Sequence, residues 1–347
     1  MSVVVIAGAG VTGLITAVRC ARAGHRVTVV DRGPIPNPSS SSFDQHRAIR
    51  ALAPGDAAAT RTSAALHRRW LRLQALLGGQ FYRRIGVVTG WPADRTDDVV
   101  DVARRADITI SLLDPNTLPH IVLPAGYVGV RETDAGVLLA ERVLHAATAW
   151  LRRHPAVTLR PWREVVAVDT DATRLELDDG TSLTGEVMLL ATGAWTGQLV
   201  DVPTILHRQT TVYLRPPDDL RAWWDRAPSA GNIGADATGW LMPPGAGTLL
   251  KLSSTELCRD AATLTEPNED RTAARQYIDR ILTDPHRYTV AAIKQCHYTV
   301  DAVTGCGALA QPGPAVWARA ATGGDGFRTA PLVADHIVEL AAAGLAA

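Results

Sequence analysis

VVVIAGAGVTG, residues 3–13, runs from an apolar β-strand through a glycine-rich turn into the start of a helix. Gly8 allows a sharp turn of the backbone, and Gly10 allows a phosphate group to approach the main chain because no Cβ stands in the way. Gly13 lets the new helix pack closely against the strand. This order of elements predicts a nucleotide-binding βαβ unit with the phosphates at the helix N-terminus.

The residues that follow complete the same unit. Apolar side chains recur at helical spacing from Leu14 to Ala21, and Gly24 is placed to end the helix. A second apolar strand, residues 26–30, leads to Asp31, whose carboxylate can accept hydrogen bonds from both hydroxyls of a ribose. An acidic residue here disfavours a cofactor with a 2′-phosphate, and the motif alone leaves both NAD and FAD open.

Length and composition set broad limits. A chain of 347 residues is long enough for about two domains. Its 35 basic and 35 acidic residues leave no net charge, so no nucleic-acid partner is expected. Four scattered cysteines form neither a C-x-x-C metal motif nor a disulfide framework, so no metal site is expected. The apolar start lacks a cationic leader and contains glycines, so we expect a cytoplasmic protein without a membrane span.

Further along the chain, helical and strand patterns alternate. Apolar spacing predicts helices over residues 136–153 and 269–282, and Pro331 is expected to open a C-terminal helix that ends near Ala343. Residues 81–133 show short strands and proline breaks, which is typical of an excursion into a second domain.

Two later glycine turns follow apolar strands. Residues 187–190 are wholly apolar and lead to Gly193, where a second close approach of the backbone to the cofactor is expected. Residues 316–321 form a last strand that leads to the glycine loop at residues 322–328. This loop precedes the C-terminal helix, so it predicts another anion site at a helix N-terminus.

Charged residues near these turns are candidates for substrate binding. Arg47 and Arg50 lie three apart just after the nucleotide unit, where ordinary surface ion pairs are the alternative. Lysine is rare, since only Lys251 and Lys294 occur beside 33 arginines. A lysine on the strand around residue 251 indicates a need for a compact ammonium group, with simple charge pairing as the alternative.

Together these stretches resemble the D-amino-acid oxidase superfamily of FAD enzymes, and within it the monomeric sarcosine oxidase group. The resemblance covers nearly the whole chain, and several distant matches in the same order favour FAD over NAD. The matching stretches are the glycine motif with Asp31, residues 46–50, residues 189–195, Arg208-Gln209, Lys251, residues 296–299 and residues 324–328.

The resemblance implies an α/β (α+β) fold with two domains. A Rossmann-like FAD-binding domain is built from discontinuous segments, residues 1–80, 136–200 and 296–347. The substrate-binding domain comprises residues 81–135 and 201–295 and contains a mixed, largely antiparallel sheet. The implied reaction oxidises the C–N bond of an amino acid or another carboxylate-bearing amine to an imine. Molecular oxygen is the acceptor, hydrogen peroxide is the product, and the protein is a monomer or dimer.

The same resemblance implies roles for individual side chains. Arg50 and Arg328 occupy the places of cationic residues that hold a substrate carboxylate, and Lys251 that of a lysine that activates oxygen near the flavin. Tyr298 falls on a pocket tyrosine, and Cys296 on a cysteine that forms a thioether with the flavin 8α carbon. The remaining predicted site residues are His46, which would position a proton, and the FAD contacts Gly8, Gly10, Val11, Thr12, Gly13, Asp31, Arg32, Ser42, Arg47, Val166, Thr192, Gly193, Trp195, Gly323, Gly324, Gly326, Phe327 and Arg328.

Covalent attachment of FAD through Cys296 has a simpler alternative, because a lone cysteine is more often an idle or buried thiol. Two features favour the bond. Cys296 begins the sequence Cys-His-Tyr-Thr ahead of the last FAD segment, as in the sarcosine oxidase group. Lys294 lies two residues earlier, so on a strand it would project to the same face and favour the thiolate.

The sequence departs from sarcosine oxidases near the substrate site. Gln45 and His46 stand where those enzymes have acidic and hydroxyl residues, and Thr255 stands where they have a pocket histidine. A different substrate is therefore expected, such as a secondary or cyclic amine from a biosynthetic pathway. Two alternatives stay open: a flavin- or NAD-dependent dehydrogenase of another small molecule, and a flavoprotein without oxidase activity.

Overall fold

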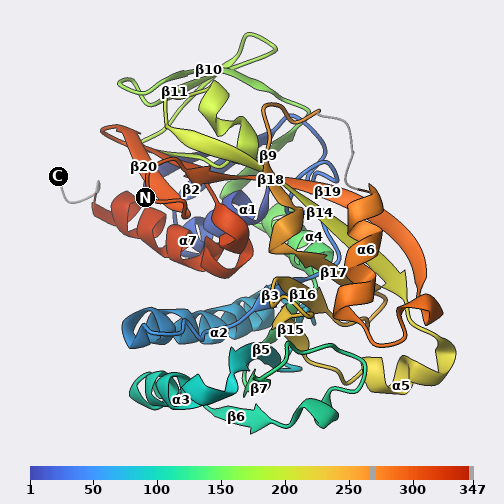
Figure 1. Cartoon of the computed structure of the whole chain (residues 1–347). Coiled ribbons are helices and arrows are strands. Elements are labelled where there is room, and N and C mark those ends of the chain that lie inside the picture. Colours follow the sequence, from blue (N-terminus) through green and yellow to red (C-terminus); the bar gives the residue numbers. More distant parts are fainter. Residues whose placement is uncertain (266–270, 344–347) are drawn as a thin grey trace.

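The computed structural model describes residues 1–265 and 271–343 and has an α/β architecture with two large sheets (Figure 1). The strands of the first sheet are β1 (Val3–Ala7), β2 (Arg26–Asp31), β9 (Val157–Pro161), β13 (Val187–Leu190), β20 (Ala308–Gly313) and β21 (Val316–Ala321). Their order is β20-β21-β13-β1-β2-β9, and all neighbours except β20 and β21 are parallel. We call this the nucleotide sheet because it carries the predicted βαβ unit.

Helices cover one face of the nucleotide sheet, and a small sheet covers the other (Figure 1). Apolar side chains of the helices form one core with β1, β2 and β13, in which Trp70 is fully buried. The helices are α1 (Val11–Arg22), α2 (Ala57–Leu77), α4 (Ala140–Arg153) and α7 (Gly326–Ala343). The small sheet consists of β10 (Val165–Asp169), β11 (Arg174–Leu177) and β12 (Ser182–Thr184).

The second sheet, here called the mixed sheet, is largely antiparallel. Its strands are β5 (Val87–Pro92), β6 (Ile110–Leu113), β7 (Tyr127–Glu132), β14 (Thr204–Arg215), β15 (Ser229–Ile233), β16 (Gly239–Met242), β17 (Leu250–Ser254), β18 (Cys258–Asp260) and β19 (Thr289–Asp301). The order is β18-β14-β17-β16-β15-β5-β7-β6, with β19 also paired to β14. Only the pair β5 and β15 is parallel among the described strands of this sheet.

One face of the mixed sheet is apolar and carries helices. Val88, Ala230, Leu241 and Leu252 are cross-strand neighbours in one row, and all four belong to the core on this face. Because side chains alternate along a strand, the residues on either side of this row project from the opposite face. This face carries α5 (Arg221–Trp224) and α6 (Arg271–Ile281), whereas α3 (Thr96–Arg105) shares a core with Val130, which pairs with Thr89 on the opposite face.

A third set of short strands changes one predicted helix boundary. Residues 136–138 were expected to begin a helix, but they form β8 (Gly136–Leu138), and α4 begins only at Ala140. β8 pairs with both β3 (Arg47–Ile49) and β4 (Tyr82–Arg83). The apolar residues of this segment are therefore buried in two different elements, the first of them in the strand β8 and the later ones in the helix α4.

Two further expectations differ from the structure. Pro331 does not open the last helix: α7 begins at Gly326, and Pro331 is buried inside it. The segment 81–133 contains the helix α3 besides its strands, with Val99 and Val102 buried. The predicted helix 269–282 corresponds to α6, and its expected start at Glu269 lies outside the described residues.

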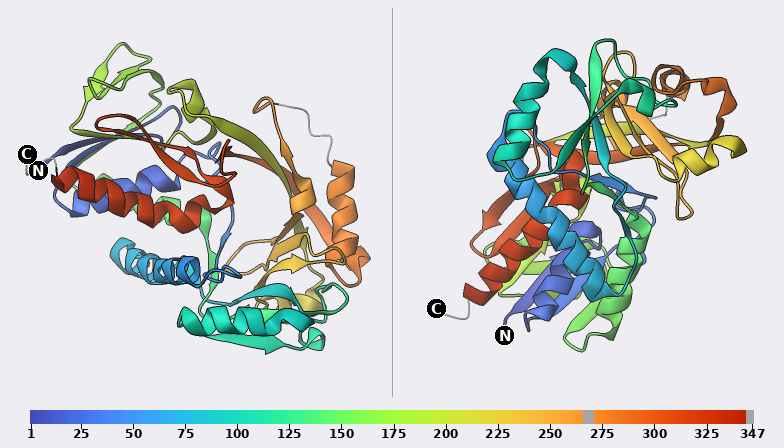
Figure 2. Two further views of the ribbon diagram at one scale, coloured as in Figure 1. Left: turned by 60° about the vertical axis from the view of Figure 1, so that its left-hand side comes forward. Right: turned by 90° about the horizontal axis from the view of Figure 1, so that it is seen from below.

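The residue bounds of the two domains remain a prediction. The proposed boundary at residue 296 falls inside β19, which continues without interruption from Thr289 to Asp301. In Figure 2 this orange-red strand extends from the mixed sheet toward the nucleotide sheet. In the described part of the chain, no helix combines the length and the apolar character needed to cross a lipid bilayer.

Candidate active site

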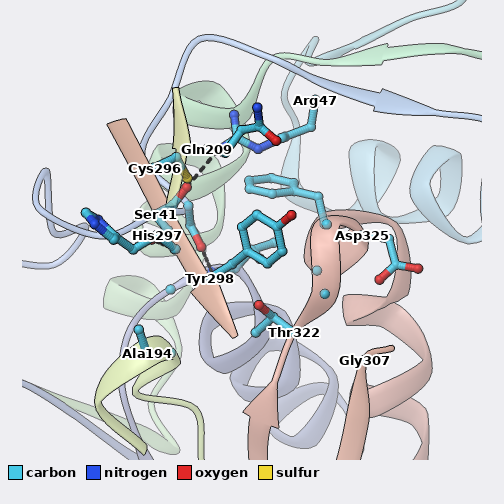
Figure 3. Close-up of a pocket in the computed structure, with 18 of the residues that line it drawn as sticks. Ser41, Arg47, Ala194, Gln209, Cys296, His297, Tyr298, Gly307, Thr322 and Asp325 are labelled. Atoms are coloured by element: carbon cyan, nitrogen blue, oxygen red, sulfur yellow. Dashed lines mark hydrogen bonds between the residues drawn. The ribbon is translucent and has the colours of Figure 1, made fainter. Parts of the chain in front are cut away.

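A cavity of about 840 Å³, here called the central cavity, is lined by residues of both the nucleotide sheet and the mixed sheet (Figure 3). It brings together predicted site residues from segments that are far apart in the sequence. The predicted residues that line it are Gly8, Gly10, Val11, Thr12, Asp31, Arg32, Ser42, Arg47, Arg50, Thr192, Gly193, Trp195, Lys251, Cys296, Tyr298, Gly323, Gly324, Gly326, Phe327 and Arg328.

Three predicted site residues do not line the central cavity. A Cβ on Gly13 would lie 1.9 Å from the Gly8 carbonyl oxygen, so this glycine allows close packing beneath the turn. The Val166 side chain is 57% exposed, and its neighbour Val165 lines the cavity instead. His46 is fully buried, and its Nε2 lies 3.2 Å from the Pro243 carbonyl oxygen.

The buried position of His46 also affects its charge. Burial, which is the strongest influence, and the charge of Lys251 lower the His46 pKa to about 3. The imidazole is therefore neutral at ordinary pH. A neutral ring outside the cavity lining gives no geometric support to the predicted role of His46 in positioning a substrate proton.

The glycine turn requires an unusual backbone conformation at Gly8. Its φ angle is +97°, which is in the region that L side chains rarely adopt. A Cβ at this position would also lie 2.3 Å from the Ala191 carbonyl oxygen. Gly8 therefore allows β1 and the segment after β13 to come together at the edge of the cavity.

The N-terminus of α1 faces the central cavity with hydrogen-bond donors. The Val11 main-chain N–H donates to Ser42 Oγ at 3.0 Å, so the predicted contact residue Ser42 lies beside the helix start. Thr12 and Gly13 supply the next N–H groups, which lie in the first helical turn and have no acceptor within a helix. These donors and the positive end of the helix dipole suit a pyrophosphate.

Asp31 stabilises the loops around the nucleotide site. Its Oδ2 accepts a hydrogen bond from the Ala9 N–H at 2.8 Å. Its Oδ1 accepts bonds from the Gly33 N–H and from Asn37 Nδ2, each at 2.9 Å. A carboxylate has about four acceptor sites, so one site on Oδ2 is left for a ribose hydroxyl. The predicted ribose contact and the shape of the glycine turn therefore depend on one side chain.

A second wall of the nucleotide site comes from the turn after β13. The Arg32 guanidinium carbon lies 3.9 Å from the centroid of the Trp195 ring, and both residues line the cavity. Trp195 belongs to the short helix η3 (Gly193–Gln198). A Cβ on Gly193 would meet no other atom within 4 Å, so a side chain there would occupy open space in the cavity.

Arg50 and Arg328 place two positive charges on the cavity wall. Burial lowers the pKa of Arg50, and the charge of Arg328 lowers it further. Arg328 donates a 2.6 Å hydrogen bond to Asp325 Oδ2. Glu132 is the other acidic group that influences Arg50, but its oxygens already accept bonds from the main-chain N–H groups of Ala51 and other donors. The wall is therefore suited to a substrate anion.

Lys251 lies on the mixed sheet with its ammonium group buried at the cavity wall. Only 4% of its side chain is exposed, and Nζ donates a 2.5 Å hydrogen bond to Asp44 Oδ2. Burial and the charge of Arg47 lower its pKa to about 8, while Asp44 opposes this shift. The ammonium group is thus largely charged at neutral pH and titrates not far above it.

β19 contributes Cys296 and Tyr298 to the cavity. Cys296 pairs with Gln209 of β14, and in Figure 3 His297 extends to the opposite side of the strand from Tyr298. The Tyr298 hydroxyl lies 3.1 Å from Cys258 Sγ, and burial raises the Tyr298 pKa. Lys294, which was expected to favour a Cys296 thiolate, instead donates to the Phe43 carbonyl oxygen at 3.0 Å.

Sequence reasoning missed several residues of this site, including Asp44, Gly231 and Trp240. Asp44 is the ion-pair partner of Lys251, although the two are 207 positions apart. Gly231 and Trp240 are cross-strand partners that line the cavity. Asp44 begins the segment that contains Arg47 and Arg50. Its position close to these two predicted cations was the sequence feature that could have identified it as a site residue.

Comparison with known proteins identifies the family. The family model described as FAD dependent oxidoreductase matches residues 3–340. This chain belongs to that family. FAD is therefore the cofactor of this oxidoreductase. Membership of the family excludes NAD, the alternative cofactor.

The curated relatives of this FAD-dependent oxidoreductase include amine oxidases. The chain is 23% identical over 219 residues to the monomeric sarcosine oxidase of Bacillus sp. (strain B-0618), which covers 59% of this chain and 56% of that protein. It is 25% identical over 202 residues to the human peroxisomal sarcosine oxidase, covering 56% and 51%. These matches span about half the length of the curated relatives.

Solved structures show that this FAD-dependent oxidoreductase shares its fold with known oxidases. A fructosyl peptide oxidase from Aspergillus nidulans has a TM-score of 0.79 at 19% identity, covering 99% of this chain and 90% of that chain. NikD, an unusual amino acid oxidase essential for nikkomycin biosynthesis, has a TM-score of 0.78 at 17% identity, covering 98% and 93%. These likenesses confirm the predicted α/β (α+β) fold with two domains.

The residues of the central cavity fit FAD. The positive end of α1, beside the Val11 N–H that donates to Ser42 Oγ, suits the pyrophosphate, and Asp31 retains an acceptor for a ribose. A Cβ on Gly193 or Gly324 would fill otherwise open space in the cavity. The part of the chain that the structure describes contains no group of three or more His, Cys, Asp or Glu side chains that could hold a metal ion.

Proposed function

We propose that this protein is an FAD-dependent oxidase of a carboxylate-bearing amine, in which the C–N bond is oxidised to an imine. A secondary or cyclic amine is the preferred substrate class. FAD, when bound, accepts the two electrons of the C–H bond as a hydride, and oxygen takes up these electrons with two protons to give hydrogen peroxide. The observation that carries the proposal is the presence of Arg50, Arg328 and Lys251 in one cavity.

Arg50 and Arg328 bind the carboxylate in this proposal. A guanidinium group presents parallel N–H donors that match the two oxygens of a carboxylate, and two such groups fix its position. Their mutual repulsion, which contributes to the lowered pKa of Arg50, is relieved when an anion lies between them. A substrate that carries a carboxylate therefore gains binding energy that its decarboxylated analogue lacks.

The same charges prepare the substrate nitrogen. A protonated amine beside two guanidinium groups is disfavoured, so the substrate pKa falls and the neutral amine predominates. Only a neutral amine has the lone pair that assists hydride loss. The reaction then requires no strongly basic side chain at the substrate, which agrees with the location of His46 outside the cavity lining.

Lys251 acts on oxygen in this proposal. Its ammonium group is buried at the wall of the central cavity. There it would stabilise the negative charge that develops as oxygen is reduced. A compact ammonium can approach a diatomic molecule more closely than the planar guanidinium of an arginine. This difference offers a reason for a lysine here in a chain that otherwise uses arginine.

The test is an anaerobic screen of the purified holoenzyme with paired substrates. Each pair contains a secondary or cyclic amino acid and the amine that lacks its carboxylate. We expect the flavin absorbance near 450 nm to be lost with one or more of the acids and to persist with the matched amines. Admission of air should restore the absorbance with formation of hydrogen peroxide. Flavin reduction by the decarboxylated amines at equal rates would contradict the proposal.

A further inference from the structure

Asp44 lies at the centre of a buried cluster of hydrogen bonds around Lys251. Its Oδ2 accepts a 2.5 Å hydrogen bond from Lys251 Nζ and forms an ion pair with Arg47. Its Oδ1 accepts bonds from the Tyr213 hydroxyl and the Gln45 main-chain N–H, each at 2.7 Å. Only 6% of the Asp44 side chain is exposed. Four donors thus converge on one buried carboxylate.

These donors keep Asp44 ionised although it is buried. Burial alone would raise its pKa, but the charges of Arg47 and Lys251 and the hydrogen bonds that it accepts hold the pKa well below the usual range of an aspartate. Loss of one of these partners would destabilise the folded protein, because the buried carboxylate charge would be less well compensated. The four donors therefore hold the Asp44 side chain in one position.

The charge of Lys251 depends on the balance within this cluster. Burial and the Arg47 charge favour the neutral amine, whereas Asp44 and Cys296 favour the ammonium ion, and the resulting pKa is about 8. Removal of Asp44 would leave Arg47 as an uncompensated neighbouring cation. The Lys251 pKa would then fall well below 8.

The remaining groups that face Lys251 are neutral. Burial raises the pKa of Tyr213 and lowers that of His46 to about 3, so neither is charged at neutral pH. Nζ lies 5.6 Å from the ring centroid of Trp240 and 5.9 Å from that of Tyr213. These rings stabilise a cation through their π faces, but they do not titrate near neutral pH.

We propose that Asp44 is a positioning residue for oxygen reduction, which holds the Lys251 ammonium group at the wall of the central cavity and keeps it protonated at neutral pH. This proposal rests on the proposed function, in which Lys251 stabilises charge on oxygen. A flexible lysine side chain loses much conformational freedom when fixed, and the short bond to Asp44 supplies this restraint before oxygen arrives.

The rarity of lysine allows a direct test on the protein itself. The chain contains only Lys251 and Lys294, so labelling with lysine that carries ¹³C at the ε carbon gives two side-chain signals in NMR spectra. The Lys294→Arg variant assigns them. In the wild type, the Lys251 signal should titrate near pH 8, and in Asp44→Asn it should titrate about 1–3 pH units lower. Lys294 should titrate identically in both proteins.

The oxygen reaction supplies the second measurement. The holoenzyme is reduced with dithionite, which requires no knowledge of the substrate, and is then mixed rapidly with oxygenated buffer. At pH 7.5, Asp44→Asn should reoxidise about tenfold or more slowly than the wild type, and its pH profile should shift to lower pH. In a Lys251→Met background, Asp44→Asn should have little further effect, because Asp44 acts through Lys251.

A second variant separates the loss of the Asp44 charge from a general effect on folding. Asp44→Glu retains the carboxylate, so the Lys251 signal should still titrate near pH 8 although the longer side chain displaces the ammonium group and slows reoxidation. Equal titration of Lys251 in the wild type and Asp44→Asn would overturn the proposal, as would a large further loss in the Lys251→Met background. If no amine reduces the flavin but the Lys251 signal shifts as expected, the proposed function fails and the link between Asp44 and Lys251 is supported.

Discussion

Gly231 of β15 lies directly opposite Trp240 of β16, so the indole borders a position that carries no side chain. Thr89 of β5 pairs with Gly231 on its other side, and all three residues line the central cavity. Among the described residues, no atom beyond the chain neighbours lies within 4 Å of the place where a Cβ of residue 231 would be. The mixed sheet therefore leaves a hollow beside Trp240 on its cavity face.

A larger residue at position 231 should change the substrate size that the enzyme accepts. Gly231→Leu fills the hollow, so the ratio of kcat/KM for a substrate with a bulky or aromatic group to that for a small one should fall about tenfold or more. The flavin spectrum should stay unchanged. Steady-state oxygen consumption with a homologous series of amino acids measures this ratio.

The matched control is Gly197→Leu. Gly197 lies in η3 and outside the cavity lining, and a Cβ there has only the Thr204 hydroxyl near it, at 3.9 Å. This variant should preserve the ratio. A Gly231→Leu enzyme with the same preference as the wild type would show that substrates do not reach the hollow.

The proposed carboxylate site at Arg50 and Arg328 predicts a selective loss of substrate binding. Arg50→Met and Arg328→Met should each raise the apparent KM for an amino-acid substrate about 10- to 100-fold, because one or more charge-assisted hydrogen bonds of about 1.5–3 kcal/mol disappear. Bound FAD should remain. Asp335→Asn, which disrupts ion pairs with Arg19 and Arg69 on α1 and α2, is the control for a lost surface charge. Unchanged KM values in both arginine variants would refute this assignment.

The proposed role of Lys251 in oxygen reduction predicts a pH dependence of flavin reoxidation. The pKa is about 8, so the ammonium form predominates below this pH and is lost as the pH rises through it. The rate constant with oxygen should therefore decrease from pH 7 to pH 9. Lys251→Met should lower it about 10²–10³-fold at pH 7 and leave no such pH step. Stopped-flow absorbance of the reduced enzyme gives these rates.

The control for Lys251 is Lys294→Met, which removes an exposed ammonium that contacts the Phe43 carbonyl oxygen. It should reoxidise like the wild type. Lys251→Met should also retain most of its rate of flavin reduction by substrate. Equal losses in the reductive and oxidative half-reactions would assign Lys251 a general structural role.

Asp31 should control the retention of FAD. Asp31→Ala removes the predicted ribose acceptor together with the bonds to Ala9, Gly33 and Asn37, so FAD binding should weaken by at least about 1.5–3 kcal/mol. Any covalent bond would mask this loss, so the measurement is made in the Cys296→Ser background by dialysis and flavin fluorescence. Retention equal to that of Cys296→Ser alone would exclude a role for Asp31 in holding the cofactor.

We expect FAD to be attached covalently through Cys296. Precipitation of the holoenzyme with acid should leave yellow protein, and mass spectrometry should find a peptide around Cys296 that is heavier by one FAD. Cys296→Ser should release its flavin, whereas Cys258→Ser, on the strand at the other side of β14, should not. Free FAD in the supernatant of the wild type would show that the flavin is held by non-covalent contacts alone.

Features with a local pattern could be predicted from the sequence. The strand, turn and helix of residues 3–22 depend on apolar spacing and glycines within one short segment, and the structure contains them as β1 and α1. The apolar run at residues 187–190 forms the parallel strand β13 for the same reason. The resemblance to a family extended these predictions to residues that no local pattern identifies, such as Lys251.

Other features depend on contacts between distant segments. The ion pair of Asp44 with Lys251 exists only because β17 lies next to β14 and the chain after β2 returns to the mixed sheet. The hollow at Gly231 depends on the register of β15 and β16, and a glycine in a strand pattern does not reveal its partner. The position of His46 in the sequence was misleading for the same reason. It lies beside predicted site residues in the chain, but its side chain points into the protein interior.

The long strand β19 determines how the central cavity can open. It pairs with β14 of the mixed sheet along its length, and its Thr299 hydroxyl donates a hydrogen bond to the Ala320 carbonyl of β21 in the nucleotide sheet. A hinge motion that separated the two sheets would have to break this bond and bend a continuous strand of 13 residues. The continuous strand therefore makes a hinge between the two sheets costly, and any conformational step in substrate entry or product release is expected in the loops at the rim of the cavity.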